Sequence, residues 1–176
     1  MNSRLQYPVI VADPPWQYRD QSLHRGGALR HYDTLPLADI KTFPVPAAND
    51  SWLFLWATNP LLSEALEVME AWDFKYLSNL VWIKPRYGMG HTVRSAHEIL
   101  LIGKRGKPIW NFHGQPSWLM APVQDHSHKP EEIYDIIQRC VDGPYLELFA
   151  RRQRHGWDGL GNQLDAFKSL EPEIKK

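Results

Sequence analysis

The sequence predicts an α/β fold with a largely parallel β-sheet flanked by helices, on three observations. Several apolar runs of strand length are uninterrupted, as in strands whose two faces are both buried. Helical patterns alternate with these runs in the second half of the chain. The 176 residues, 43% of them hydrophobic and 23% charged, supply enough apolar material for a globular core. We therefore expect one domain over residues 1–176, with its core at about 7–165 and a charged tail at 166–176.

The first strand is predicted at residues 9–13, where an apolar run meets two prolines. Pro14 and Pro15 cannot donate ladder hydrogen bonds, so the strand must stop at Asp13. The turn then presents a carboxylate, free carbonyl groups and the flat ring of Trp16, which together suit a planar ligand with an amino group, such as a nucleobase. The alternative is structural: Asp13 would cap a helix and Trp16 would belong to the core.

Residues 17–46 are predicted to form a long loop, with a short helical turn near 37–41. Because this loop directly follows the Asp13 turn, we expect it to lie over the same site. Tyr32 is its most suggestive aromatic residue, either as a contact to a ligand or as an anchor that packs the loop down.

Two strands and a helix are predicted in the middle of the chain. The apolar run 51–57 has the length of a buried strand. Asn59-Pro60 then reads as a helix start, and apolar residues at helical spacing predict a helix over 60–72. The run 79–85 is a further strand that ends at a proline.

Residues 84–97 form a basic loop in a chain whose 20 basic and 20 acidic residues cancel. No acid occurs in it before Glu98. Its basic residues are Lys84, Arg86, His91, Arg94 and His97. The loop is either a contact for phosphate groups or an ordinary solvated loop.

The remaining chain predicts two more strands and one helix. Residues 98–103 form a strand, 108–128 are irregular, 130–141 form a helix that starts at a proline followed by acids, and 145–150 form the last clear strand. A basic and then glycine-rich segment follows at 151–163. Because ligands bind beyond the carboxyl ends of parallel strands, this segment, the Asp13 turn and the 84–97 loop can converge on one rim.

Composition excludes several classes of site. The single cysteine, Cys140, excludes an internal disulfide framework and a cysteine-based zinc site, and it is expected to pack in the core. His126 and His128 lack a suitable spacing of further ligands, so no metal is expected. With no apolar run of about 20 residues and no signal region, we expect a cytoplasmic protein without a membrane span.

The tetrapeptide Asp13–Trp16 resembles the catalytic motif of amino-group methyltransferases, and its tryptophan form resembles the MT-A70 family of N6-adenine methyltransferases. Further segments are similar to this family in the same order along residues 7–165. They are Trp52–Trp56, Trp82–Lys84, His97–Gly103 with Gly106, Ser127–Tyr134, Glu147–Arg151 and Gly161–Asp165. The chain looks like a compact bacterial or phage member.

The resemblance implies a Rossmann-like class I methyltransferase fold, in which the catalytic motif precedes the cofactor-binding strand. It implies S-adenosylmethionine as cofactor, S-adenosylhomocysteine as product and no metal. The expected reaction is methyl transfer to the exocyclic N6 of adenine in DNA. The alternatives are adenine in RNA, or a non-catalytic subunit of the same fold that binds nucleic acid. A homodimer is left open, and the expected location is a bacterial or phage-infected host cytosol.

The resemblance also assigns roles to individual residues. The catalytic residues are Asp13, Pro14, Pro15 and Trp16, with Asp13 and the Pro14 main chain accepting hydrogen bonds from the adenine amino group. The cofactor-binding residues are Asp13, Lys129, Glu147, Arg151, Asn162 and Gln163, with Lys129 on the methionine carboxylate. The substrate-binding residues are Trp16, Tyr32, Lys84, Arg86, His91 and Arg94. The segment from Arg151 to Trp157 is shorter than in the eukaryotic members, so Gln153, Arg154 or His155 takes over contacts there.

Overall fold

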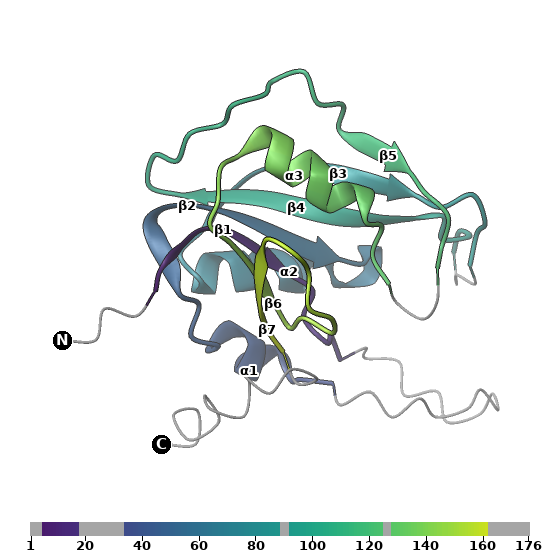
Figure 1. Cartoon of the computed structure of the whole chain (residues 1–176). Coiled ribbons are helices and arrows are strands. Elements are labelled where there is room, and N and C mark those ends of the chain that lie inside the picture. Colours follow the sequence, from purple (N-terminus) through teal and green to yellow (C-terminus); the bar gives the residue numbers. More distant parts are fainter. Residues whose placement is uncertain (1–4, 18–33, 89–91, 125–127, 162–176) are drawn as a thin grey trace.

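The computed structural model describes residues 5–17, 34–88, 92–124 and 128–161. Seven strands in this part of the chain form one sheet in the order β5-β3-β4-β2-β1-β6-β7. The strands are β1 (Tyr7–Ala12), β2 (Ala47–Ala57), β3 (Lys75–Ile83), β4 (His97–Arg105), β5 (Trp118–Met120), β6 (Tyr145–Leu148) and β7 (Trp157–Leu160). Figure 1 shows the sheet as the strongly twisted centre of the molecule.

The prediction of a mostly parallel sheet flanked by helices is confirmed. The pairs β1–β2, β1–β6, β6–β7 and β3–β5 are parallel, and only β4 runs against its neighbours β2 and β3 among the described strands. The apolar run 98–103 would have two buried faces in a parallel or an antiparallel strand. Its sequence therefore does not show that β4 is antiparallel to its neighbours. Because β4 alone is reversed, the carboxyl ends of β1, β2, β3 and β5 still share one edge of the sheet.

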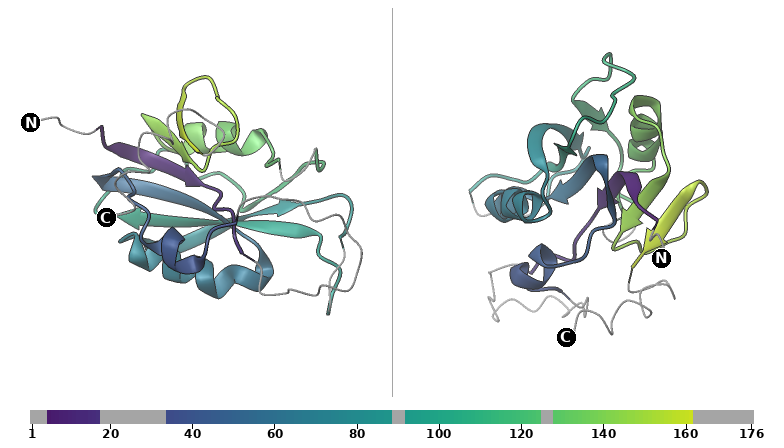
Figure 2. Two further views of the ribbon diagram at one scale, coloured as in Figure 1. Left: turned by 90° about the horizontal axis from the view of Figure 1, so that it is seen from below. Right: turned by 90° about the vertical axis from the view of Figure 1, so that its left-hand side faces the viewer.

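Helices cover both faces of the sheet, α1 and α2 on one side and α3 on the other (Figure 2). They are α1 (Leu37–Lys41), α2 (Leu62–Ala71), preceded by the short 3₁₀ helix η1 (Asn59–Leu61), and α3 (Glu132–Cys140). Alternating residues of β1 enter the two cores: Ile10 packs with the α1 and α2 side, whereas Val9 and Val11 pack with the α3 side. This alternation shows that β1, between β2 and β6 in the sheet, is covered by helices on both faces in a three-layer arrangement.

The helical predictions are confirmed, with small changes of boundary. The helix predicted at 60–72 starts as a 3₁₀ turn because Asn59-Pro60 lies at its beginning. Cys140 is buried in the α3 core, where it acts as a packing residue.

Two short edge strands were not predicted. β5 lies within the segment expected to be irregular, and β7 lies within the segment read as glycine-rich loop. Strands of 3 and 4 residues are too short to show a clear alternation of apolar and polar residues. Both pair on one side only within the described sheet, so polar residues and glycine are tolerated in them.

The turn after β1 forms as the prolines predict. Pairing of β1 with its neighbours ends at Ala12, and the Asp13 amide makes a last, long contact to the carbonyl oxygen of Leu148 at 3.5 Å. The chain returns to the same turn at Leu35, whose amide donates to the Pro15 carbonyl at 2.9 Å. The predicted 17–46 loop therefore comes back to the Asp13 turn at Leu35, and no helix follows Asp13 directly in the described residues for it to cap. In the described residues, no helix is long and apolar enough to cross a membrane.

Candidate functional site

A buried ion pair links the Asp13 turn to the segment before α3. The Lys129 ammonium nitrogen lies 3.1 Å from Oδ2 of Asp13, and the Lys129 side chain is only 12% exposed. It also lies over the ring of Trp56 at 5.4 Å from the centroid. An unpaired ammonium could not remain at this depth, so the carboxylate of Asp13 is part of what holds Lys129 in place.

Lys129 has a second carboxylate partner, Glu98 at the start of β4. Its ammonium lies 3.1 Å from Oε2 of Glu98, and Lys84 lies 2.5 Å from the other oxygen of that carboxylate. The four side chains Lys84, Glu98, Lys129 and Asp13 thus alternate in sign along a connected row.

The pKa values follow from this row. Burial by itself would lower the pKa of Lys129, but the carboxylates of Asp13 and Glu98 outweigh it and raise that pKa. Burial by itself would raise the pKa of Glu98, but Lys129 and Lys84 outweigh it and lower that pKa. Lys129 and Glu98, the two inner members of the row, are therefore held in their charged forms at neutral pH.

Glu147 of β6 points into the same site. Its Oε1 accepts a hydrogen bond of 2.8 Å from the hydroxyl of Tyr134 on α3. In the register of the sheet Glu147 lies beside Val11, two residues before Asp13. Burial raises the pKa of Glu147, and the nearby Asp13 raises it further against the opposing hydrogen bond. Burial and the Glu147 carboxylate both raise the pKa of Tyr134, so its hydroxyl stays a donor.

Arg154, in the connection from β6 to β7, closes one side of the site. Its guanidinium lies 3.4 Å from the centroid of the Tyr134 ring and pairs with both oxygens of Glu131. Its Nε is buried, has no hydrogen-bond acceptor within the described residues and lies 3.8 Å from Oε2 of Glu147. Burial lowers the pKa of Arg154.

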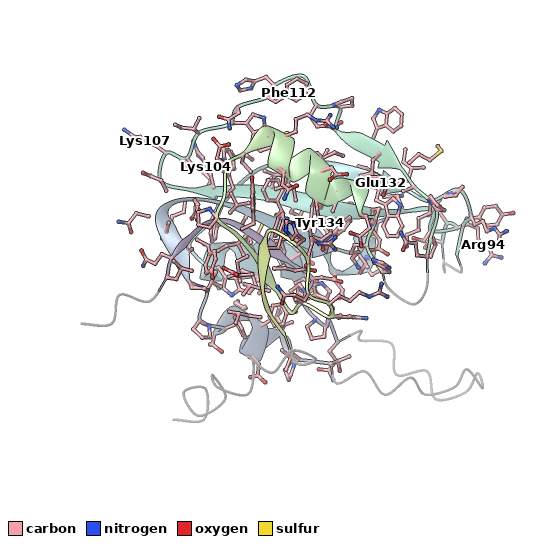
Figure 3. The ribbon with its side chains drawn as sticks, viewed as in Figure 1. Arg94, Lys104, Lys107, Phe112, Glu132 and Tyr134 are labelled. Carbon is pink, nitrogen blue, oxygen red and sulfur yellow. The ribbon has the colours of Figure 1, made fainter. Side chains whose placement is uncertain are left out.

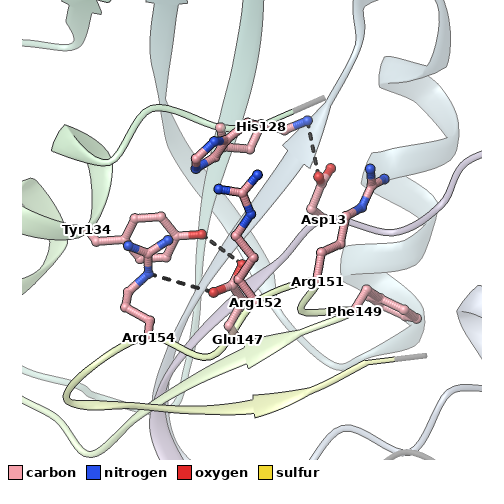
Figure 4. A pocket seen from close by; sticks show the side chains of 9 residues that line it. Asp13, His128, Tyr134, Glu147, Phe149, Arg151, Arg152 and Arg154 are labelled. Atoms are coloured by element: carbon pink, nitrogen blue, oxygen red, sulfur yellow. Dashed lines mark hydrogen bonds and ion pairs between the residues drawn. The ribbon is translucent and has the colours of Figure 1, made fainter. Parts of the chain in front are cut away.

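Asp13, Lys129, Tyr134, Glu147 and Arg154 line one cavity at the carboxyl ends of β1 and β6 (Figure 4). Its volume is about 60 Å³, well below the several hundred Å³ of a site filled by a cofactor. Arg154 takes up part of the space beside Glu147 and Tyr134. The residues that line the cavity are Asp13, His128, Lys129, Tyr134, Glu147, Phe149, Arg151, Arg152 and Arg154.

The structure brings four of the predicted site residues together. Asp13, Lys129, Glu147 and Arg151 line this cavity, although they come from three separate segments of the chain. Glu147 reaches the cavity from β6, where its two neighbours in the strand are the apolar residues Leu146 and Leu148. The cofactor roles of these residues stay predictions.

Other predicted residues lie elsewhere. Trp16 is only 8% exposed and its indole nitrogen donates to the carbonyl oxygen of Trp56 at 3.1 Å, so it occupies the core position that the sequence also allowed. Stacking of Trp16 on a base stays a prediction and would require the ring to leave this position. Pro14 is buried and its carbonyl accepts from the Trp16 amide at 2.8 Å, which leaves one lone pair of that oxygen. Pro15, the other proline of the motif, accepts from Leu35.

The substrate residues divide into three groups. Lys84 joins the site through Glu98, whereas Arg86 and Arg94 are exposed on the loop between β3 and β4. Figure 3 places Arg94 at the end of the sheet opposite Lys104. The remaining predicted residues lie outside the described part of the chain. They are Tyr32 and His91, predicted to bind the substrate, and Asn162 and Gln163, predicted to bind the cofactor.

Sequence reasoning missed Glu98 and Tyr134 as members of the site, whereas it named Arg154 as one of three alternatives with Gln153 and His155. Glu98 has a signal of its own, because an acid inside an apolar strand needs a buried partner. Tyr134 lies in the recognised segment 127–134, but its contact with Glu147 depends on how α3 packs on β6. In the described residues no three His, Cys, Asp or Glu side chains are grouped to hold a metal ion.

Comparison with known proteins identifies the family of the chain. The model of the family described as MT-A70 matches residues 7–163. A rice (Oryza sativa subsp. japonica) protein named "Probable N(6)-adenosine-methyltransferase MT-A70-like" is 31% identical over 97% of this chain and 25% of its own length. The human "N(6)-adenosine-methyltransferase catalytic subunit METTL3" is 30% identical over 96% of this chain and 30% of its own length.

A shorter relative is matched over most of its length. "Type II methyltransferase M.MunI" of Mycoplasma sp is 30% identical over 92% of this chain and 79% of its own length. By contrast, the chain spans about a quarter to a third of the N(6)-adenosine-methyltransferases that it matches. The family match covers nearly all of the described fold, including the Asp13 turn, Lys129 and Glu147. The chain therefore belongs to the MT-A70 family and has its Rossmann-like methyltransferase fold.

Proposed function

We propose that this protein transfers a methyl group from S-adenosylmethionine to the exocyclic N6 of adenine in DNA. The observation that carries the proposal is the Asp13 carboxylate, held by buried Lys129 at the end of β1 and facing the same cavity as Glu147. The family match and the names of the relatives, which are N(6)-adenosine-methyltransferases and a Type II methyltransferase, support the reaction class.

Asp13 would compensate for the weak nucleophilicity of the adenine amino group. The lone pair of the adenine N6 is delocalised into the ring, so the amino group is a poor nucleophile. Oxygen acceptors on its N–H groups, from the Asp13 carboxylate and the Pro14 carbonyl, favour a lone pair localised on nitrogen. Lys129 fixes the Asp13 carboxylate at 3.1 Å, so the acceptor does not have to be organised during the reaction.

The donor side of the cavity fits an amino acid linked to a nucleoside. Lys129 has three N–H donors, and two of them face Asp13 and Glu98 in the described structure, which leaves one for a carboxylate. Oε2 of Glu147 has no hydrogen bond among those of the described residues and suits a ribose hydroxyl. S-adenosylmethionine would supply an activated methyl group on a positively charged sulfur. The carboxyl groups of Asp13 and Glu147 line the cavity that would receive this cation, and negative charge on them would favour its binding.

DNA is the proposed acceptor because M.MunI, which is named a Type II methyltransferase, is matched over most of its length. RNA is the second candidate, since the relatives named for adenosine match almost the whole of this chain.

Isothermal calorimetry with S-adenosylmethionine tests the donor side. The wild-type protein should bind the cofactor, and Lys129→Ala should bind it about tenfold more weakly, a loss typical of one charge-assisted hydrogen bond. Absence of binding to the wild-type protein would favour the non-catalytic subunit that binds nucleic acid. Equal affinity of the two proteins would remove Lys129 from the cofactor site.

A further inference from the structure

A second hollow lies at the same edge of the sheet as the Asp13 cavity. It is an open groove of about 850 Å³ between the loop after β3 and the segment after β5. β1, β3 and β5 end at one edge of the sheet, and Lys84 of the groove is linked through Glu98 to Lys129 of the cavity. The groove is lined by Lys84, Pro85, Arg86, Tyr87, Gly88, Ser95, Pro122, Val123 and Gln124.

Tyr87 presents an aromatic ring to this groove. Its side chain is 74% exposed, and Val123 across the groove is 50% exposed. An aromatic face left in water in this way is available to a flat ligand, and covering it releases hydrophobic free energy.

The loop holds Tyr87 at a fixed place. The Lys84 amide donates to the Ala96 carbonyl at 2.8 Å, and the Gly88 amide donates to the Ser95 carbonyl at 2.7 Å. Tyr87 therefore lies inside a hydrogen-bonded stem, directly before one of its pairs. Because the backbone is already organised here, a ligand that stacks on Tyr87 has to order only the side chain.

The charge around the groove selects an anionic ligand. Residues 84–97 contain no acid, and Arg86 beside Tyr87 is exposed. Lys84 lines the groove and also contacts Glu98, which contacts Lys129, the partner of Asp13. A ligand in the groove therefore lies next to the row of charges that ends at the Asp13 carboxylate.

We propose that Tyr87 is a stacking platform for a base next to the target adenine, in a single-stranded stretch of the nucleic acid whose phosphates lie against Arg86. The combination of an exposed aromatic ring and cations along a groove is how proteins hold single strands without reading their sequence. The proposal deepens the proposed function, because it names the acceptor as an unpaired strand, and it rests on that function for the position of the adenine.

The test uses short single-stranded oligonucleotides with 2-aminopurine, a fluorescent base, at each position beside one adenine, without cofactor. With the wild-type protein and with Tyr87→Phe, which keeps the ring, fluorescence should be quenched at one flanking position. Tyr87→Ala should lose this quenching and bind the oligonucleotide roughly tenfold more weakly, as expected for the loss of one stacked base. Tyr76→Ala serves as the control, because Tyr76 is also exposed but lies at the start of β3.

Equal binding and quenching by Tyr87→Ala and the wild-type protein would overturn the proposal. So would a Tyr87→Ala protein that binds oligonucleotide normally but differs in sedimentation, since the groove would then be an interface between copies of the chain. Quenching at Tyr87 without any methyl transfer would contradict the proposed function and leave the groove intact. Methyl transfer that is insensitive to Tyr87→Ala would contradict the proposed role of the groove and leave the proposed function intact.

Discussion

The ammonium nitrogen of Lys129 lies 3.1 Å from Oδ2 of Asp13, although one residue follows β1 and the other precedes α3. This contact joins the element that is proposed to hold the acceptor to the element that is proposed to hold the donor. It also makes Asp13 more than a free carboxylate at a strand end, because its position is set by a buried cation that Glu98 holds from the other side. Substitutions of Asp13 and of Glu98 test this arrangement.

Asp13→Asn should lower the rate of methyl transfer at saturating cofactor by about 100- to 1,000-fold, the scale for removing one organised electrostatic contact to a transition state. The amide keeps one oxygen and nearly the same shape, so the circular dichroism spectrum should not change. Steady-state kinetics with labelled cofactor provides the rate. A rate close to that of the wild-type protein would exclude Asp13 as the acceptor of the amino group.

Glu98→Gln should flatten the acid side of the stability curve. The pKa of Glu98 is lowered in the folded state, so its stabilising contribution is complete above its ordinary value of 4.5 and disappears as pH falls through the folded value. The glutamine cannot titrate, so this part of the pH dependence should vanish. At pH 7 the variant should be less stable by about 1–3 kcal/mol, because Lys129 and Lys84 each lose a partially buried charged partner.

Urea unfolding at pH 7 and at successive values below 4.5 measures this effect. Glu67→Gln is the matched control, since Glu67 pairs with Lys41 at 3.1 Å on the exposed surface. Loss of this surface ion pair should change the free energy of unfolding by less than about 1 kcal/mol. Parallel pH curves for wild type and Glu98→Gln would show that the carboxylate is not held in its charged form by the two lysines.

Arg154→Ala should bind S-adenosylmethionine about three- to tenfold more tightly than the wild-type protein. The guanidinium fills space beside Glu147, and the wild-type protein must give up its stacking on Tyr134 before a ribose can enter, at a cost of about 1 kcal/mol. Calorimetry gives the affinity, with Arg139→Ala as a control for the loss of an arginine stacked on an exposed ring. Weaker binding by Arg154→Ala would mean that the guanidinium is itself a ligand of the cofactor.

Replacement of both Arg86 and Arg94 by glutamine should weaken binding to nucleic acid of any sequence. Each phosphate contact that is lost should reduce the slope of log affinity against log salt concentration by about 0.7–0.9. Fluorescence anisotropy over a range of salt concentrations measures the slope, and replacement of Lys104 and Lys107, at the other end of β4, provides the control. An unchanged slope would mean that the loop between β3 and β4 makes no phosphate contacts and is ordinary solvated surface.

Local chemistry explains what the sequence could predict. Two consecutive prolines end β1 whatever its neighbours in the sheet are. The apolar face of α3 requires this helix to pack on the sheet. Apolar runs of strand length that alternate with helices carrying one apolar face therefore predict a sheet between two layers of helices. The direction of β4 is different, because an apolar run looks the same in both orientations and only its partners decide.

The residues of the candidate site also divide into those that a sequence motif predicts and those that only the folded structure reveals. Asp13, Lys129, Glu147 and Arg151 were found through motifs that keep their order along the chain. Glu98 and Arg154 join the site through contacts between segments far apart in sequence, and no local pattern encodes those contacts. Trp16 shows the limit most clearly: the same flat ring serves a base or the core, and its hydrogen bond to Trp56 depends on the packing of the folded chain.

The proposed reaction is tested most directly by incubating the protein with S-adenosylmethionine carrying a labelled methyl group, together with DNA and RNA of the same sequence. Digestion to nucleosides and mass spectrometry then identify the labelled product. We expect label on N6-methyladenine from the DNA, and far less of it after the same time in a parallel reaction with Asp13→Asn. Label on cytosine, label on no nucleoside at all, or equal label with Asp13→Asn would contradict the assignment of Asp13 and of the reaction.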